Sequence, residues 1–108
     1  MKRYVITHNA IEGFHMYPEA PDFCKYLGNT HRHIFVVICE FEVQHNDRQT
    51  EINQRQLEIA SYFSGKYGMP CQFGALSCED IAEDIITNLG ATSVKVLEDG
   101  YGGAYITR

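Results

Sequence analysis

The chain has 108 residues, enough for one domain and too few for two, so we expect a single domain over residues 1–108. Hydrophobic residues make up 44% of the chain and only three residues are proline, which argues against a disordered protein. The net charge of −5 disfavours nucleic acid as a partner, and no apolar run approaches the ~20 residues of a membrane-spanning helix. The chain has no signal-peptide pattern at its start and no Cys-X-X-Cys pair, so we expect a cytoplasmic protein whose four cysteines are reduced.

The first half of the chain predicts two strands joined by a loop. Residues 2–11 alternate loosely and are rich in Tyr, Val, Ile and Thr, which favours a strand. Residues 16–30 contain prolines, glycine and asparagine and therefore predict a loop. Residues 31–44 predict a long strand, because alternate side chains point to opposite faces. One face of this strand carries two histidines and then apolar side chains, namely His31, His33, Phe35, Val37, Cys39, Phe41 and Val43.

The second half predicts two helices followed by two strands. Residues 52–67 suit a helix with an imperfect apolar stripe, formed by Ile52, Leu57, Ala60 and Phe63. A second helix begins after Ser77, which with Asp80 approximates a capping box, and Gly90 ends this helix.

Residues 93–98 and 104–107 predict the last two strands, on either side of a turn at 99–103. The resulting order is β-β-α-α-β-β. This order predicts an α+β fold, in which a four-stranded antiparallel sheet carries two helices on one face.

Three histidines are the candidate metal ligands. His31 and His33 lie two residues apart at the start of a predicted strand, so both side chains point to one face, ~6–7 Å apart along the strand. His15, from the neighbouring strand, supplies a third imidazole. Three protein nitrogens with one open position are the arrangement of a catalytic zinc ion, whereas structural zinc usually has four protein ligands. The alternative is a polar strand end that binds no metal.

Four short motifs follow one another in the chain. Ile11-Glu12-Gly13-Phe14-His15 ends the first strand, His31-Arg32-His33 opens the second, Ser77-Cys78-Glu79 opens the second helix, and Val94-Lys95-Val96-Leu97-Glu98-Asp99 covers the third strand. In this order they resemble motifs of the 6-pyruvoyl-tetrahydropterin synthase and 6-carboxytetrahydropterin synthase family, which are Phe-X-Ala-X-His, His-Gly-His, Thr-X-Glu and Val-X-Val-X-Glu-Thr. The likeness covers nearly the whole chain.

The resemblance implies a tunnelling fold and a ligand set for Zn²⁺, with the three histidines as its members. It implies that Glu98 anchors a pterin substrate and that Ser77 and Glu79 bind the same substrate. The alternative for Ser77 and Glu79 is that they serve only to start the helix. Members of the family close their sheets into a barrel, so the resemblance also implies a homo-oligomer, most simply a hexamer of two rings. The free edges of the sheet agree with self-association, since proteins tend to pair or cover such edges.

The resemblance further implies that Cys24 is the base that abstracts a proton. Lys25 and a nearby zinc ion would both lower the pKa of this thiol. However, Cys24 lies seven residues before His31, whereas the family's cysteine lies four to six residues before its His-Gly-His motif. The family's Asp-His pair has no counterpart either, because no histidine follows His45.

The resemblance implies a zinc-dependent lyase that acts on 7,8-dihydroneopterin triphosphate or a related pterin and forms 6-carboxytetrahydropterin, on the route to 7-deazaguanines. A 6-pyruvoyl-tetrahydropterin synthase activity and a non-catalytic pterin- or purine-binding module are the alternatives. A cupin-type metal enzyme would be all-β, which the two predicted helices disfavour. A zinc nucleobase deaminase needs a Pro-Cys-X-X-Cys motif, which Pro70-Cys71-Gln72-Phe73 does not complete.

Overall fold

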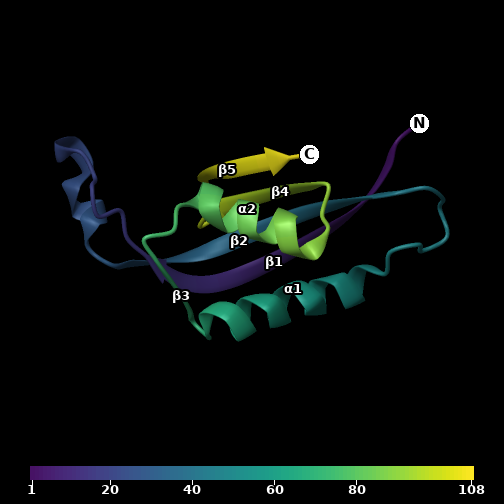
Figure 1. The fold of residues 1–108 in the computed structure, drawn as a ribbon, viewed down its shortest axis with the longest axis horizontal. Coiled ribbons are helices and arrows are strands. Elements are labelled where there is room, and N and C mark those ends of the chain that lie inside the picture. The colour runs from purple at the N-terminus through teal and green to yellow at the C-terminus, as the bar shows by residue number, and fades with distance from the viewer.

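The computed structural model describes all residues from 1 to 108, and they form an α+β fold with a five-stranded mixed sheet (Figure 1). The elements in chain order are β1 (Arg3–His15), the 3-10 helix η1 (Asp22–Gly28), β2 (His31–Val43), α1 (Ile52–Tyr67), β3 (Cys71–Gly74), α2 (Cys78–Leu89), β4 (Ser93–Glu98) and β5 (Gly102–Thr107). Within the sheet the strands follow the order β3-β1-β2-β4-β5. The predicted α+β class is confirmed.

The predicted four-stranded, purely antiparallel sheet is wrong, because β3 adds a fifth strand parallel to β1. Cys71 of β3 pairs with Gly13 of β1, and Gln72 pairs with Phe14. The strand is only four residues long, follows Pro70 and ends at Gly74, and no strand was predicted for these residues. What makes it a strand is its pairing with β1, which is nearly sixty residues away in sequence and leaves no local signal.

The antiparallel pairing of β1 and β2 is the longest in the molecule. It runs without interruption from Arg3 opposite Val43 to His15 opposite His31. β1 therefore extends four residues past the predicted end at residue 11, whereas β2 agrees with its prediction to within one residue. β4 has its predicted bounds, and β5 begins two residues earlier than predicted.

The core lies between one face of the sheet and the two α-helices. β2 contributes Phe35, Val37 and Cys39, each with 0% of its surface exposed, which confirms the predicted inner face. The apolar side of α2 packs on the same core through Ile81, Ala82, Ile85 and Ile86. The predicted cap of α2 is also confirmed, because the Ser77 hydroxyl accepts a hydrogen bond from the Asp80 amide, and the Asp80 carboxylate accepts one from the Ser77 amide.

The predicted apolar stripe of α1 is wrong at two of its four positions. Ile59 and Phe63, one helical turn apart, are the buried residues of this helix. Leu57 is 69% exposed, because it lies about 200° around the helix from Ile59. Ile52 is 48% exposed and is the first residue of the helix. Ile52 and Leu57 fitted the helical spacing only in part, and including them in the stripe predicted the wrong buried face for α1.

The opposite face of the sheet is not covered by any element of the chain. It carries exposed or half-buried apolar side chains, including Ile6, Ile34, Val36, Ile38 and Leu97. Arg32 also lies on this face, away from the histidines, and pairs with Glu12 at 2.5 Å. No helix of the structure is both long enough and apolar enough to cross a membrane.

Candidate metal centre

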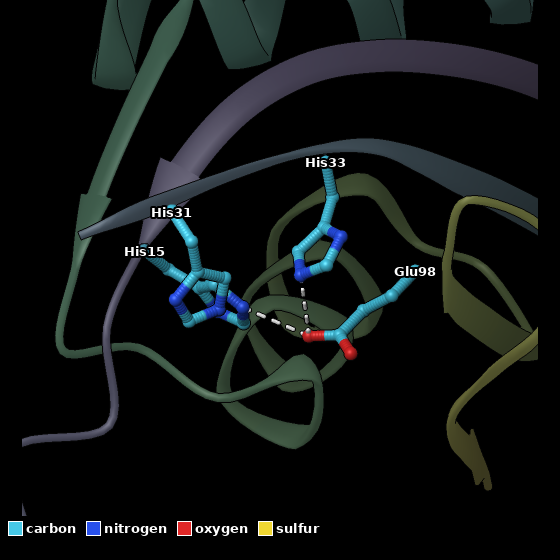
Figure 2. Close-up of side chains that lie close together, drawn as sticks. All are labelled: His15, His31, His33 and Glu98. Atoms are coloured by element: carbon cyan, nitrogen blue, oxygen red, sulfur yellow. Dashed lines mark ion pairs between the residues drawn. The ribbon is translucent and has the colours of Figure 1, made fainter. Parts of the chain in front are cut away.

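Three strand ends meet at one end of the sheet and bring four candidate ligands together (Figure 2). His15 ends β1, His31 and His33 open β2, and Glu98 ends β4. His15 faces His31 directly, and Glu98 faces Phe35, so the alternation of each strand places all four side chains on the inner face. One ligand atom from each side chain lies within 4.8 Å of those of the other three. The sequence prediction that the three histidines converge is consistent with this cluster.

Each imidazole is fixed through its Nδ1 atom. His15 Nδ1 is 3.0 Å from the Leu76 carbonyl oxygen, and His31 Nδ1 is 2.8 Å from the Asn29 carbonyl oxygen. Both partners accept hydrogen bonds only, so each Nδ1 carries the hydrogen and donates it. The Nε2 atom then keeps its lone pair. Metal-binding histidines in proteins almost always donate their other ring N–H in this way.

His33 follows the same rule with a charged partner. Its Nδ1 is 2.6 Å from Asp99 Oδ2, and the second oxygen, Oδ1, accepts the Ile34 amide at 2.8 Å. The Ile34 amide and the His33 imidazole hold the pKa of Asp99 below its usual range, so this carboxyl is ionised at neutral pH. Asp99 therefore orients the His33 ring and fixes its tautomer, as the carboxylate does in carboxylate–histidine–zinc sites.

The centre of the cluster contains lone pairs and a carboxylate but no hydrogen-bond donor. His15 Nε2 lies 2.8 Å and His33 Nε2 lies 3.6 Å from Glu98 Oε2. Neither contact is aligned as a hydrogen bond, and both Nε2 atoms are buried without a hydrogen-bonding partner. Buried lone pairs that face a carboxylate are unfavourable unless a cation or a proton lies among them.

The four ligands fit a divalent cation. Because the four ligand atoms lie within 4.8 Å of one another, a single point lies within about 3 Å of all of them, against the ~2.0–2.2 Å of zinc–ligand bonds. Shifts of about 1 Å in the side chains therefore suffice for coordination. Three imidazoles and a carboxylate suit first-row divalent cations such as Zn²⁺. Phe35 packs edge to face against His15 and His33, with ring centroids 5.0 and 5.6 Å away, and supports these rings from the core.

A cavity of about 490 Å³ opens beside the cluster, and its volume is typical of sites for small molecules. Three sides of its wall are supplied by the ends of the sheet, the start of α2 and the loop that follows β1. The lining residues are His15, Tyr17, Leu27, His31, Ala75, Ser77, Cys78, Glu79, Glu98 and Gly103. Glu98, Ser77 and Glu79, the predicted substrate-binding residues, therefore border one cavity together with two of the predicted metal ligands.

Cys24, the predicted base, is not among the residues that line this cavity. It is buried, with 8% of its surface exposed, inside η1. This helix belongs to the dark-blue segment that projects beyond the sheet in Figure 1. His45, the other histidine considered as a proton carrier, lies in the turn after β2. It is about 40 Å along the chain direction from His33, too far to share the site.

Two residues of the site were not assigned a role from the sequence. Asp99 had a usable signal, since an acidic residue directly after Glu98 lies at the same strand end. Cys78 lies inside the motif at the start of α2, but neither its type nor its position predicted that it would line the cavity. Burial, together with the neighbouring carboxylates of Glu98 and Glu79, raises the pKa of Cys78 to about 12, so it is a neutral thiol at pH 7.

Comparison with known proteins adds no family to this geometry: no protein-family model matches the chain, and no curated protein matches it significantly.

Proposed function

We propose that the protein binds one Zn²⁺ ion per chain through His15, His31 and His33 and acts on a pterin in the adjoining cavity, as a 6-carboxytetrahydropterin synthase-like lyase. The observation that carries the metal part of the proposal is the convergence of three imidazoles whose Nδ1 atoms are all bonded to acceptors. The pterin part rests on the resemblance of the four motifs and on the cavity that all four of them border.

The cavity has the chemistry that a bicyclic, nitrogen-rich ligand requires. Glu79 and Glu98 offer carboxylate oxygens for N–H groups at the edge of a heterocycle. Tyr17, Leu27 and Ala75 provide apolar and aromatic surface for its ring. When bound, Zn²⁺ polarises a substrate carbonyl or stabilises an enediolate.

A second candidate function, a pterin- or purine-binding module without turnover, is favoured by the thiols of the site. Cys78 borders the cavity as a neutral thiol, and Cys24 does not border the cavity of its own chain. For Cys24 to act as the base, a second copy of the chain has to bring it to the cavity. The lyase proposal therefore depends on self-association, and the binding module does not.

We propose that the protein self-associates, with the family's hexamer as the simplest form. The apolar side chains on the uncovered face of the sheet support this proposal. So do the two sheet edges, β3 and β5, which have no neighbouring strand on their outer sides.

The metal proposal is tested by the metal content of purified protein and of its histidine variants. His33→Ala is expected to lose most of the bound zinc, whereas wild type holds close to one equivalent per chain. His8→Ala is the matched control, since His8 is an exposed histidine on the uncovered face of β1. Zinc that stays bound when His15, His31 and His33 are all replaced by alanine would place the metal elsewhere and end the proposal.

The reaction is tested by incubation of zinc-loaded protein with 7,8-dihydroneopterin triphosphate and identification of products by mass. 6-Carboxytetrahydropterin as the product supports the lyase, and a 6-pyruvoyl product assigns the sister activity. Tight binding of the pterin without turnover supports the binding module. Neither binding nor turnover would overturn the pterin assignment and leave the metal site in place.

A further inference from the structure

Glu98 is directed at the metal ligands, although the resemblance assigns it to the substrate. As the last residue of β4, it pairs with Phe35 and lies on the same face as His33. Its Oε2 atom is closer to His15 Nε2, at 2.8 Å, than is usual for two atoms that both carry lone pairs and do not form a hydrogen bond. Figure 2 shows this oxygen between the rings of His15 and His33.

From this geometry we propose that Glu98 is the fourth protein ligand of the metal ion when no substrate is bound, and that an incoming chelating ligand displaces it. The inference rests on the metal site proposed above. It makes the resting site a closed site of three nitrogens and one oxygen, and it gives Glu98 two roles that exclude each other. The carboxylate either binds the metal or accepts N–H donors of the ligand.

The turn after β4 holds Glu98 in this position. Asp99 accepts hydrogen bonds from His33 and Ile34, and its own amide donates to the Ile34 carbonyl oxygen at 2.8 Å. These three bonds tie the backbone next to Glu98 to the backbone next to His33. The carboxylate is therefore presented to the metal ligands by a fixed strand end and not by a loose loop.

The carboxylate also has space to leave. The Glu98 side chain is 36% exposed and borders the cavity, whereas His15 is 9% exposed. Its neighbours on β5, Gly102 and Gly103, have no side chains that would block its rotation. Glu79 also borders the cavity, so a displaced Glu98 carboxylate would share the cavity with a second carboxylate. A ligand with adjacent N–H donors would offset the repulsion between these two charges. The ligand class is thus a heterocycle that carries N–H donors and a group that binds the metal ion.

The first test measures Zn²⁺ affinity without any ligand, by competition with a chromophoric chelator. Glu98→Ala and Glu98→Gln are expected to bind Zn²⁺ at least ~10-fold more weakly than wild type, since loss of even an outer partner of a metal ligand costs 10–100-fold. Glu12→Ala is the matched control. This carboxylate lies three residues before His15 on the outer face and forms an exposed pair with Arg32, so its loss is expected to leave the affinity unchanged.

The second test uses the Co²⁺-loaded protein and acetohydroxamate, a chelator with two oxygens. The visible spectrum of Glu98→Ala is expected to differ from that of wild type before the chelator is added and to coincide with it afterwards. Because no carboxylate has to be displaced, Glu98→Ala is also expected to bind acetohydroxamate several-fold more tightly. Circular dichroism confirms that each variant is folded, and Glu98→Gln keeps the shape of the side chain if the alanine variant does not fold.

The outcomes separate this inference from the metal site itself. Retention of zinc when all three histidines are replaced would end both. Suppose that His33→Ala loses its zinc, but both Glu98 variants keep wild-type affinity for Zn²⁺ and an unchanged Co²⁺ spectrum. That result would overturn only the role of Glu98 as a ligand. Equal acetohydroxamate affinity in wild type and Glu98→Ala would overturn the displacement.

Discussion

Replacement of Asp99 by asparagine should weaken metal binding without a change in the shape of the site. The two carboxylate oxygens of Asp99 each accept one hydrogen bond, from the Ile34 amide and from His33 Nδ1. The asparagine amide has one oxygen and one NH₂ group, so one of these donors must face another donor. If the oxygen stays with Ile34, the NH₂ group favours the His33 tautomer with its hydrogen on Nε2. In that tautomer Nε2 has no free lone pair, so His33 cannot bind the metal ion through Nε2 until this hydrogen is displaced.

The expected loss follows from the known effect of removing such partners. Substitution of an outer-shell partner costs 10–100-fold in metal affinity, which corresponds to ~1.4–2.8 kcal/mol. Asparagine is also compatible with the backbone here, because Asp99 has a φ of 54° and asparagine tolerates this left-handed region well. Asp99→Asn should therefore fold like wild type, and its effect should be confined to His33.

The assay is competition for Zn²⁺ with a chromophoric chelator, combined with nitrogen NMR of the His33 ring to identify its tautomer. Glu12→Gln is the matched control, since it makes the same carboxylate-to-amide change on the outer face of the adjacent strand. If Asp99→Asn binds zinc as tightly as Glu12→Gln, Asp99 does not control His33 and the reasoning is refuted.

Four further results are expected. Burial alone would raise the pKa of Asp84, but hydrogen bonds from Tyr62 and other donors outweigh it and lower the pKa; the stabilisation is therefore present above pH ~4 and lost as the pH falls through the folded-state pKa. Urea midpoints should accordingly fall more steeply into acid for wild type than for Asp84→Asn, and parallel curves would contradict this. Gly13→Ala should cost ~1–3 kcal/mol in urea unfolding, because its Cβ would lie 2.6 Å from the Phe73 ring; an unchanged midpoint would show that the ring gives way freely. Light scattering should give the mass of an oligomer, at least twice the 12.3 kDa of one chain. Cys24→Ala should keep the assembly and its zinc but lose ~10²-fold in turnover. A stable monomer would end the self-association proposal, and unchanged turnover would exclude Cys24 as the base.

The sequence predicted those parts of the fold that depend on local pattern. The period of two in β2 identified its buried face and placed His31 and His33 at the end of that face, because neighbouring side chains of a strand alternate whatever the strand pairs with. The capping box of α2 was equally local, since Ser77 and Asp80 interact within one turn. In both cases the determining contacts lie within a few residues of each other in the chain.

The parts that were missed depend on contacts between distant segments. β3 is a strand only because Cys71 and Gln72 pair with β1, and no strand was predicted from its four residues alone. Leu57 is exposed because another side of α1 packs on the sheet. Ile52 and Leu57 lie away from the packed side, and their apolar side chains led to the wrong prediction of the buried face. The histidine tautomers could not be predicted from the sequence, because they depend on acceptors that are distant in the chain. The acceptor for His15, for example, is the carbonyl oxygen of Leu76, 61 residues away.

The order of the strands decides the chemistry of the metal centre more than the histidines do. The three histidines lie on β1 and β2, a pair that the chain joins directly, so their convergence follows from one antiparallel pairing. Glu98 reaches them only because β4, and not β5, pairs with β2 on its other side. Were β5 the neighbour of β2, the same residues would give three imidazoles, with the carboxylate one strand, ~4.8 Å, further away. The difference between an open three-nitrogen site and one that a carboxylate can close therefore lies in a long-range pairing. For that reason the metal affinity of the Glu98 variants tests the topology of the sheet as well as the role of the residue.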